Sequence, residues 1–249
     1  MRIDAHQHFW GPYTPDLLWS ILNRNRFEGS ITVQSIAGMD ETRRLLDLAK
    51  ANDFVRGVIA WVDLADPRLG DKLDALQRED KFKGVQWAPE SDDDEVPAGA
   101  LELACRGLPL DLLIRPQHLP LIPRLAERVP PLRMVIDHIA QPDVEGGVSG
   151  AWARGMEAAA EIPQVYCKLS ALSLLDAPKW HAAALKPFVQ HVLRSFGPDR
   201  LMFGSGWPAC LEAGRWKESL AAFTQSIGAL PMEVREKLLG ATAKNFYLL

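Results

Sequence analysis

Short apolar runs recur along the whole chain and alternate with segments of helical periodicity. The runs are rich in β-branched residues, and several are nearly continuous in their hydrophobicity, which is typical of parallel strands buried on both faces. Eight strands are predicted in this way: Arg2–Phe9, Ser30–Ser35, Val55–Trp61, Phe82–Trp87, Leu108–Ile114, Leu132–His138, Gln164–Ser170 and Arg200–Ser205.

The segments between these runs carry helix signals. A carboxylate opens Asp40–Ala51, whose Leu45, Leu46 and Ala49 share one face, and Gly197-Pro198 ends a helix predicted over Pro178–Phe196. Two further helices are predicted at Gly214–Ile227 and Met232–Leu239. Eight strands alternating with helices in about 250 residues is the count of a TIM barrel. We therefore predict an α/β protein, a single (β/α)8 barrel domain over residues 1–249. The alternative is a doubly wound open sheet, but no G-x-G-x-x-G turn is present.

Composition and charge argue against some classes of function but do not identify the activity. The chain has 249 residues, is 47% hydrophobic and carries a formal net charge of −4. Charges of both signs are spread along it, so no nucleic-acid partner is expected. No apolar run is long enough to span a bilayer, and the first strand follows Met1 without an apolar leader. The sequence therefore predicts a cytoplasmic protein with a small-molecule partner and no membrane contact, and it leaves the oligomeric state open.

The first predicted strand ends in a histidine pair. A strand alternates its faces, so His6 and His8 point the same way, with Cα atoms roughly 6.6 Å apart. Two imidazoles at this spacing can converge on one metal ion or one small substrate. Asp4 shares their parity and could orient them. A third histidine, His138, stands at the end of the sixth predicted strand. In a (β/α)8 barrel the carboxyl ends of the strands form the active-site face, so the three histidines are expected at one mouth.

Several motifs fall on these strand ends. They are Ile3–Trp10 (IDAHQHFW), Gly57–Leu64 (GVIAWVDL), Val135–Pro142 (VIDHIAQP), Val165–Ser170 (VYCKLS) and Gly197–Pro208 (GPDRLMFGSGWP). In these motifs the chain resembles the amidohydrolase superfamily, specifically its sugar-lactonase branch, with L-fuconolactonase-like, L-rhamnonolactonase-like and pyrone dicarboxylate lactonase members. The resemblance implies a (β/α)8 barrel, hydrolysis of a small lactone and a role in carbohydrate metabolism. It also implies a reaction centre of the strand-one histidines, the strand-six histidine and a strand-eight aspartate, with a divalent metal such as zinc in some members.

The chain departs from this pattern at two positions. The relatives read Gly-Ser-Asp-Trp-Pro after strand eight, whereas Gly206 stands at the aspartate's position here. That carboxylate takes a proton from the attacking water and can ligate metal, and glycine can do neither. The relatives also commonly carry Arg-His where this chain has Gln86-Trp87. Glutamine lacks the charge and the fork of donors with which arginine holds an anion.

Other residues could compensate for the missing base or shape the pocket. His118, just past strand five, is the best spare base, because a neutral imidazole accepts a proton near neutral pH. Glu90 is a second possibility. Lys168 shares strand parity with Tyr166 and Ser170 and is expected to pair with a carboxylate inside the barrel. Asp137, of opposite parity to His138, is expected to face the helices or to brace a neighbouring element. The predicted substrate-binding residues are Trp10, Gln86, Trp87, His118 and Trp207.

These observations predict a lactone-opening hydrolase whose activity is impaired or altered by Gly206. His6, His8 and His138 are its predicted catalytic residues and the ligands of any metal, which would be weakly held or absent. Two alternatives stay open. One is a homologue that binds a small acid or lactone without turning it over, and the other is a lyase or isomerase that uses the same pocket.

Overall fold

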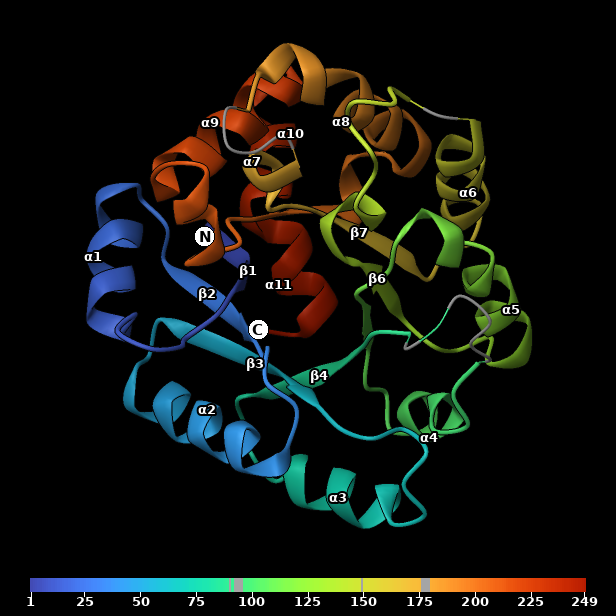
Figure 1. Ribbon diagram of the computed structural model, residues 1–249. Coiled ribbons are helices and arrows are strands. Elements are labelled where there is room, and N and C mark those ends of the chain that lie inside the picture. Colours follow the sequence, from blue (N-terminus) through green and yellow to red (C-terminus); the bar gives the residue numbers. More distant parts are fainter. Residues whose placement is uncertain (90, 92–95, 149, 176–179) are drawn as a thin grey trace.

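Eight parallel strands form one sheet in the computed structural model, in the order of the sequence (Figure 1). The structure describes all residues except 90, 92–95, 149 and 176–179. The strands are β1 (Ile3–Gln7), β2 (Gly29–Val33), β3 (Val55–Trp61), β4 (Phe82–Trp87), β5 (Leu110–Leu112), β6 (Met134–Ile136), β7 (Val165–Ser170) and β8 (Leu201–Gly204). All eight predicted strands are confirmed. The sheet curls until its last strand reaches its first, where the His8 amide donates to the Trp207 carbonyl at 2.7 Å. The predicted (β/α)8 barrel is therefore the observed fold.

Helices surround the sheet on its outside (Figure 1). They are α1 (Pro15–Arg24), α2 (Met39–Ala51), α3 (Leu69–Leu76), α4 (Ala100–Cys105), α5 (Leu121–Arg128), α6 (Gly150–Ala160), α7 (Leu172–Leu175), α8 (Ala182–Phe196), α9 (Trp216–Ile227), α10 (Met232–Glu236) and α11 (Thr242–Tyr247). A wide turn over Lys237–Ala241 joins the last two, so the helical segment predicted to end at Leu239 continues almost to the end of the chain. The first predicted residues of the Pro178–Phe196 helix, 178 and 179, lie outside the described residues.

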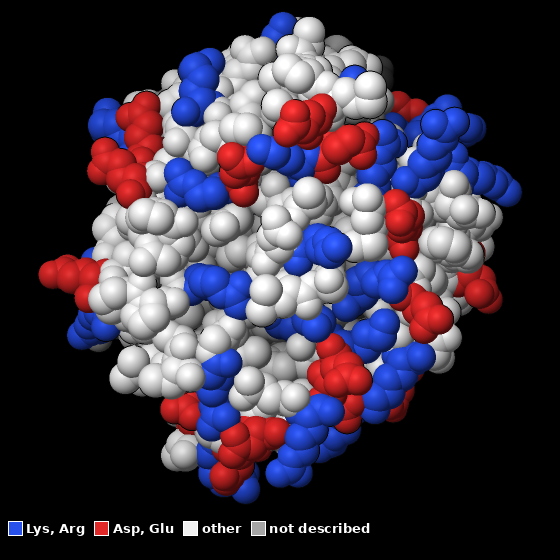
Figure 2. Space-filling model, turned by 180° about the vertical axis from the view of Figure 1, so that it is seen from behind, with Lys and Arg blue, Asp and Glu red and all other residues white. Residues whose placement is uncertain are grey.

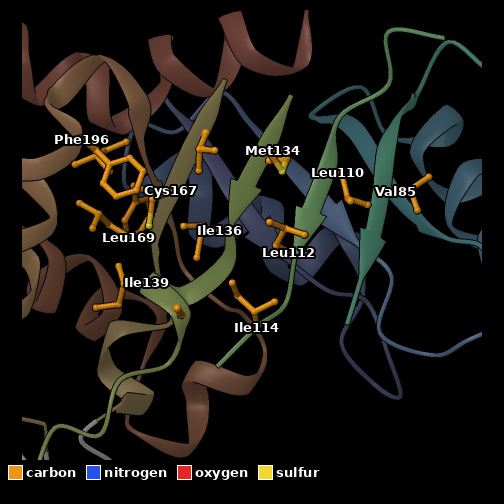
Figure 3. Close-up of a cluster of buried hydrophobic side chains, with 14 of the residues drawn as sticks. Val85, Leu110, Leu112, Ile114, Met134, Ile136, Ile139, Cys167, Leu169 and Phe196 are labelled. Atoms are coloured by element: carbon orange, nitrogen blue, oxygen red, sulfur yellow. The ribbon is translucent and has the colours of Figure 1, made fainter. Parts of the chain in front are cut away.

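The barrel has two separate apolar layers because each strand alternates its side chains between two faces. One layer lies between strands and helices, and Figure 3 shows part of it on β4 to β7, with Phe196 of α8 beside Cys167 and Leu169. The other layer fills the barrel interior. Its buried members include Ile3, Ala5, Ile31, Val33 and Ile59 together with Ala243, Phe246 and Tyr247 of α11.

The C-terminal helix α11 thus contributes to the interior of the barrel, and it lies in the middle of the view in Figure 1. Just before it, Gly240 lies against the start of β1, and a Cβ at this position would be 2.2 Å from the Met1 carbonyl oxygen. Only glycine permits this close approach of two backbones. The approach brings α11 to the barrel, where Phe246 and Tyr247 close the apolar interior. The space left for polar chemistry is therefore at the other end, where the strands finish.

The surface carries charges of both signs. In Figure 2, which views the molecule from behind, basic and acidic side chains lie next to one another across the visible face. Several of the exposed pairs are within one helix, such as Arg43 with Asp40. Among the described residues, no helix has the length and apolar composition needed to cross a bilayer.

Candidate functional site

His6 and His8 converge at the carboxyl end of β1. Their Nε2 atoms are 3.2 Å apart, and His6 is only 1% exposed. The strand is irregular just before and around His6. Asp4 pairs with Ser30 and Gln7 with Thr32, so β1 has one more residue than β2 between these two pairs. Such a bulge changes which residues share a face.

The bulge also decides the position of Asp4, which the strand parity had placed beside the histidines. Asp4 instead accepts hydrogen bonds from the Ser205 amide (2.7 Å) and from Trp216 Nε1 of α9 (3.1 Å). The expectation that Asp4 could orient the imidazoles is therefore wrong. It contacts only the backbone of His6, whose amide lies 3.4 Å from Asp4 Oδ1.

His138 joins the pair from a turn rather than from a strand. β6 ends at Ile136, and His138 has φ 52°, the first of four consecutive left-handed residues. This unusual backbone directs the ring toward β1, where the ring centroids of His138 and His6 are 4.4 Å apart. The structure thus brings the three predicted histidines together, although the strand that was expected to carry His138 ends two residues earlier, at Ile136.

The Nδ1 atoms of His8 and His138 each have a hydrogen-bond partner. His8 Nδ1 donates to the Val33 carbonyl at 2.7 Å, and His138 Nδ1 lies 2.8 Å from Ser170 Oγ. Because a carbonyl oxygen only accepts, the proton of neutral His8 is on Nδ1 and its Nε2 carries a lone pair. Burial lowers the pKa of His8 to about 4 and lowers the pKa values of His6 and His138 as well. All three rings are therefore neutral near pH 7, the form that ligates metal or accepts a proton.

Beneath His6 lies a buried cluster of charged groups. Lys168 Nζ is 2.6 Å from Asp111 Oδ2 and 2.9 Å from Asp137 Oδ1, and Asp137 Oδ1 is 3.3 Å from His6 Nδ1. Tyr247 of α11 donates its hydroxyl to Asp111 at 2.8 Å. These side chains are fully buried. The predicted pairing of Lys168 with a carboxylate inside the barrel is confirmed.

The two carboxylates differ in their electrostatics. For Asp137, burial alone would raise the pKa, but the Lys168 charge and His6 hold it well below its usual range. For Asp111, burial outweighs Lys168 and raises the pKa to about 6. Asp137 is thus the permanently charged partner of His6. Of its two expected positions, the one facing the helices is wrong, because β6 ends before residue 137 and the alternation of a strand no longer applies there. The other agrees with the structure, because Asp137 pairs with Lys168 of the neighbouring strand β7.

The end of β8 contributes backbone only. The Gly206 amide donates to the His6 carbonyl at 2.9 Å, and Gly206 has φ +70°. A Cβ at this position would lie 2.9 Å from the Cβ of Ala171, which is itself left-handed at φ 51°. Position 206 is therefore next to His6, as expected, but its conformation and surroundings suit a residue without a side chain.

A cavity of about 530 Å³ opens beside His138. Among the described residues it is lined by Ala88, Pro89, Ser91, Leu113, Arg115, Gln117, His118, His138 and Gln141. His118 thus lines the same cavity as His138. Its Nδ1 accepts from the Arg115 amide at 3.2 Å, so the proton of the neutral ring is on Nε2. His118 is therefore placed as a hydrogen-bond donor, and this geometry argues against its expected role as the spare base. Glu90, the other spare base, lies outside the described residues.

The remaining predicted binding residues lie in different surroundings. Trp10 stacks on His8, with ring centroids 4.9 Å apart, so it borders the histidine cluster. Gln86 turns its amide inward and donates to Asp137 Oδ2 at 2.9 Å. Trp87 is half-buried against the outer apolar layer, and Trp207 is 1% exposed and packs edge-on against Phe9 and Tyr13. Gln86, Trp87 and Trp207 are not among the described residues that line the cavity.

The geometry of the histidine cluster decides which side chains could ligate a metal ion. Within the described part of the chain, no group of three His, Cys, Asp or Glu side chains converges closely enough to hold one. Two donors do converge. When His6 donates Nδ1–H to Asp137, the lone pairs of His6 Nε2 and His8 Nε2 face each other at 3.2 Å. Two nitrogens bound to one tetrahedral zinc at about 2.0–2.1 Å lie about 3.3 Å apart. The pair therefore fits a divalent ion such as zinc, but no carboxylate completes the set at position 206.

Comparison with known proteins identifies the family. The sequence profile described as Amidohydrolase matches residues 3–249. The chain belongs to the amidohydrolase family. It is 34% identical to an L-fucono-1,5-lactonase of Burkholderia ambifaria, over 99% of this chain and 95% of that one, and 29% identical to an L-fucono-1,5-lactonase of Burkholderia multivorans, over 100% and 96%. A crystal structure of a Burkholderia multivorans amidohydrolase with bound zinc superposes with a TM-score of 0.92 at 30% identity, over 100% of this chain and 99% of that one.

Sequence reasoning missed Asp111 and Tyr247. Asp111 had a signal, because it is the one charged residue in the apolar run Leu108–Ile114 and shares the inward parity of its strand. Tyr247 had no such signal, because nothing in the sequence of a C-terminal helix indicates that its side chains enter the barrel.

Proposed function

We propose that this amidohydrolase opens a small lactone, a sugar-acid lactone or a related one, to its hydroxy acid. The observation that carries the proposal is the convergence of three neutral, anchored histidines beside a cavity of about 530 Å³, a volume within the usual range for small-ligand sites. The two curated relatives described above are lactonases, which supports the same chemistry and a place in carbohydrate metabolism.

The reaction adds the oxygen of water to the lactone carbonyl carbon and breaks the bond to the ring oxygen. The water loses a proton, and the ring oxygen gains one. In our proposal the substrate lies in the cavity with its carbonyl toward His6, His8 and His138. Asp137 holds His6, the Val33 carbonyl holds His8, and Ser170 holds His138, so the three rings keep their directions without reorganisation during the reaction.

The missing part is an acceptor for the proton of the water. A carboxylate after β8 would stand next to His6, but Gly206 offers only a backbone amide, which donates to the His6 carbonyl. A positioned general base typically contributes a factor of roughly 10² to 10⁴ in rate. We therefore propose an activity that is impaired, or altered in its substrate, relative to a site with that carboxylate.

We also propose that the site binds a divalent metal ion weakly. Of the three predicted ligands, His6 and His8 converge closely enough to hold it, and a bound zinc ion would polarise the carbonyl and lower the pKa of a bound water. Without a carboxylate ligand we expect substoichiometric metal in the purified protein. Elemental analysis after dialysis against a chelator measures this directly. One tightly held zinc per chain would contradict it.

A panel of sugar-acid lactones with pH-stat detection tests the function. The expected result is release of one acid per lactone opened, faster than spontaneous hydrolysis and abolished by His138→Ala. Binding of lactones or acids without any acid release would replace the proposal with a non-catalytic binding role for the same pocket.

A further inference from the structure

We propose that Arg115 holds a carboxylate carried by the substrate outside its lactone ring, which makes the substrate a monolactone of a sugar dicarboxylic acid. This inference rests on the proposed function and deepens it, because it concerns the far wall of the same cavity.

The first support is the position of Arg115 in the fold. It follows β5 by three residues and precedes the single turn Pro116–His118. Its backbone amide donates to His118 Nδ1 at 3.2 Å, which ties the start of this turn to its end. Arg115 is among the residues that line the cavity that His138 also lines. A molecule in this cavity can therefore contact the histidine cluster and Arg115 at once.

The second support is the charge of the cavity wall. Of the described residues that line the cavity, Arg115 is the only lysine or arginine, and none is an aspartate or glutamate. Arg115 also forms no ion pair with any carboxylate in the described parts of the chain, unlike Arg44 with Glu41 and Arg106 with Asp74. A guanidinium presents five N–H donors in a planar fork that matches a carboxylate with two parallel hydrogen bonds.

The third support comes from the neighbouring strand. Gln86 of β4 pairs in register with Asp111 of β5, so it stands beside the strand that leads to Arg115. Its amide already donates to the buried Asp137 at 2.9 Å, and it is not among the described residues of the cavity wall. Recognition of an anion at this side of the mouth therefore depends on Arg115. The cavity volume of about 530 Å³ accommodates a lactone ring and a carboxylate together.

Two lactones that differ only in the group in question provide the test. The gamma-lactone of glucaric acid carries a free carboxylate, and that of gluconic acid carries a hydroxymethyl group instead. Arg115→Gln is expected to raise the KM for the glucaric lactone relative to that for the gluconic lactone by roughly 10- to 100-fold, the loss expected for a charged hydrogen-bonded pair. Arg115→Lys keeps the charge without the fork and should lie between. Arg124→Gln removes an exposed arginine of α5 and should leave the ratio unchanged.

The same variants separate this inference from the proposed function. If the native protein opens no lactone of the whole sugar-acid panel, the proposed function fails, and calorimetric titration with glucarate then tests Arg115 alone. Binding to the native protein that weakens roughly 10- to 100-fold in Arg115→Gln, but not in Arg124→Gln, supports the inference. Equal effects of Arg115→Gln on both lactones, equal glucarate affinities in the native and variant proteins, or no glucarate binding at all would overturn it.

Discussion

The two sides of the histidine cluster are built very differently. On the side of β5 to β7, His6 and His138 rest on side chains that are themselves held: Asp137, Lys168 and Ser170. On the side of β8, the contact to His6 is a backbone hydrogen bond from Gly206, a residue without a side chain. The side of β5 to β7 is a network of buried charged side chains, and the side of β8 is a turn that contacts His6 through its backbone.

This difference separates two tasks of an active site. Orientation of His6 and His138 depends on their contacts with Asp137 and Ser170, which are present. In our proposal, acceptance of a proton from water is the task of a carboxylate at the β8 end, where Gly206 stands. The molecule therefore keeps the means to hold and direct a substrate while it lacks one means to activate water. The following variants test each side in turn.

The largest effect is expected at His138 itself. His138→Ala removes a ring that borders both His6 and the cavity, so turnover should fall by roughly 10²- to 10⁴-fold, with little change in thermal melting. His181→Ala, at the exposed start of α8, is the matched control and should change neither quantity. Comparable losses of turnover in both variants would show that the reaction centre is not at this mouth.

Lys168→Met tests the network side. It leaves Asp111 and Asp137 buried without their cation, so the free energy of unfolding should fall by about 3–5 kcal/mol. Urea denaturation measures this, with Lys186→Met on the exposed surface of α8 as the control, expected within about 0.5 kcal/mol of the native protein. A stability loss as small as that of the control would mean that the buried ion pairs do not hold the barrel interior together.

Gly206→Asp tests the β8 side of the histidine cluster. A carboxylate here should raise lactone hydrolysis, metal occupancy or both by at least about tenfold. The structure adds a cost, because φ +70° and the contact with Ala171 should lower the free energy of unfolding by about 1–3 kcal/mol.

The double variant Gly206→Asp with Ala171→Gly removes the crowding methyl group and should recover part of that stability. Rates and thermal melting of the single and double variants are compared on several sugar-acid lactones. If the double variant folds normally and the unchanged protein is still the faster catalyst, the absence of the carboxylate is not what restrains this site.

The smallest effect concerns the link between the network and α11. Tyr247→Phe removes the hydroxyl that donates to Asp111 and should lower the free energy of unfolding by about 1 kcal/mol. Tyr166→Phe is the control, since Tyr166 stacks near Phe246 in the same interior without a hydrogen bond to that network. Equal costs in the two variants would indicate that packing, rather than the hydrogen bond to Asp111, accounts for the loss.

The fold and the site were predictable to different degrees. The eight strands follow from runs of apolar residues, and hydrophobic burial acts over whole segments, so single exceptions do not disturb it. The face of an individual side chain is less robust, because it depends on where a strand ends. Asp4 and Asp137 were misplaced for this reason, one by a bulge in β1 and the other by the end of β6 at Ile136.

By itself, the sequence determined the barrel and the mouth at which His6, His8 and His138 meet, whereas the absence of a carboxylate at position 206 is visible only through the resemblance to relatives. These are consequences of periodicity and residue identity, which are local. Only the tertiary structure decided that Asp137 and Lys168 lie under His6, that Tyr247 reaches Asp111, and that Arg115 lines the cavity of His138. Those contacts join residues far apart in the chain, and they depend on how bulges, left-handed turns and strand ends direct side chains in space.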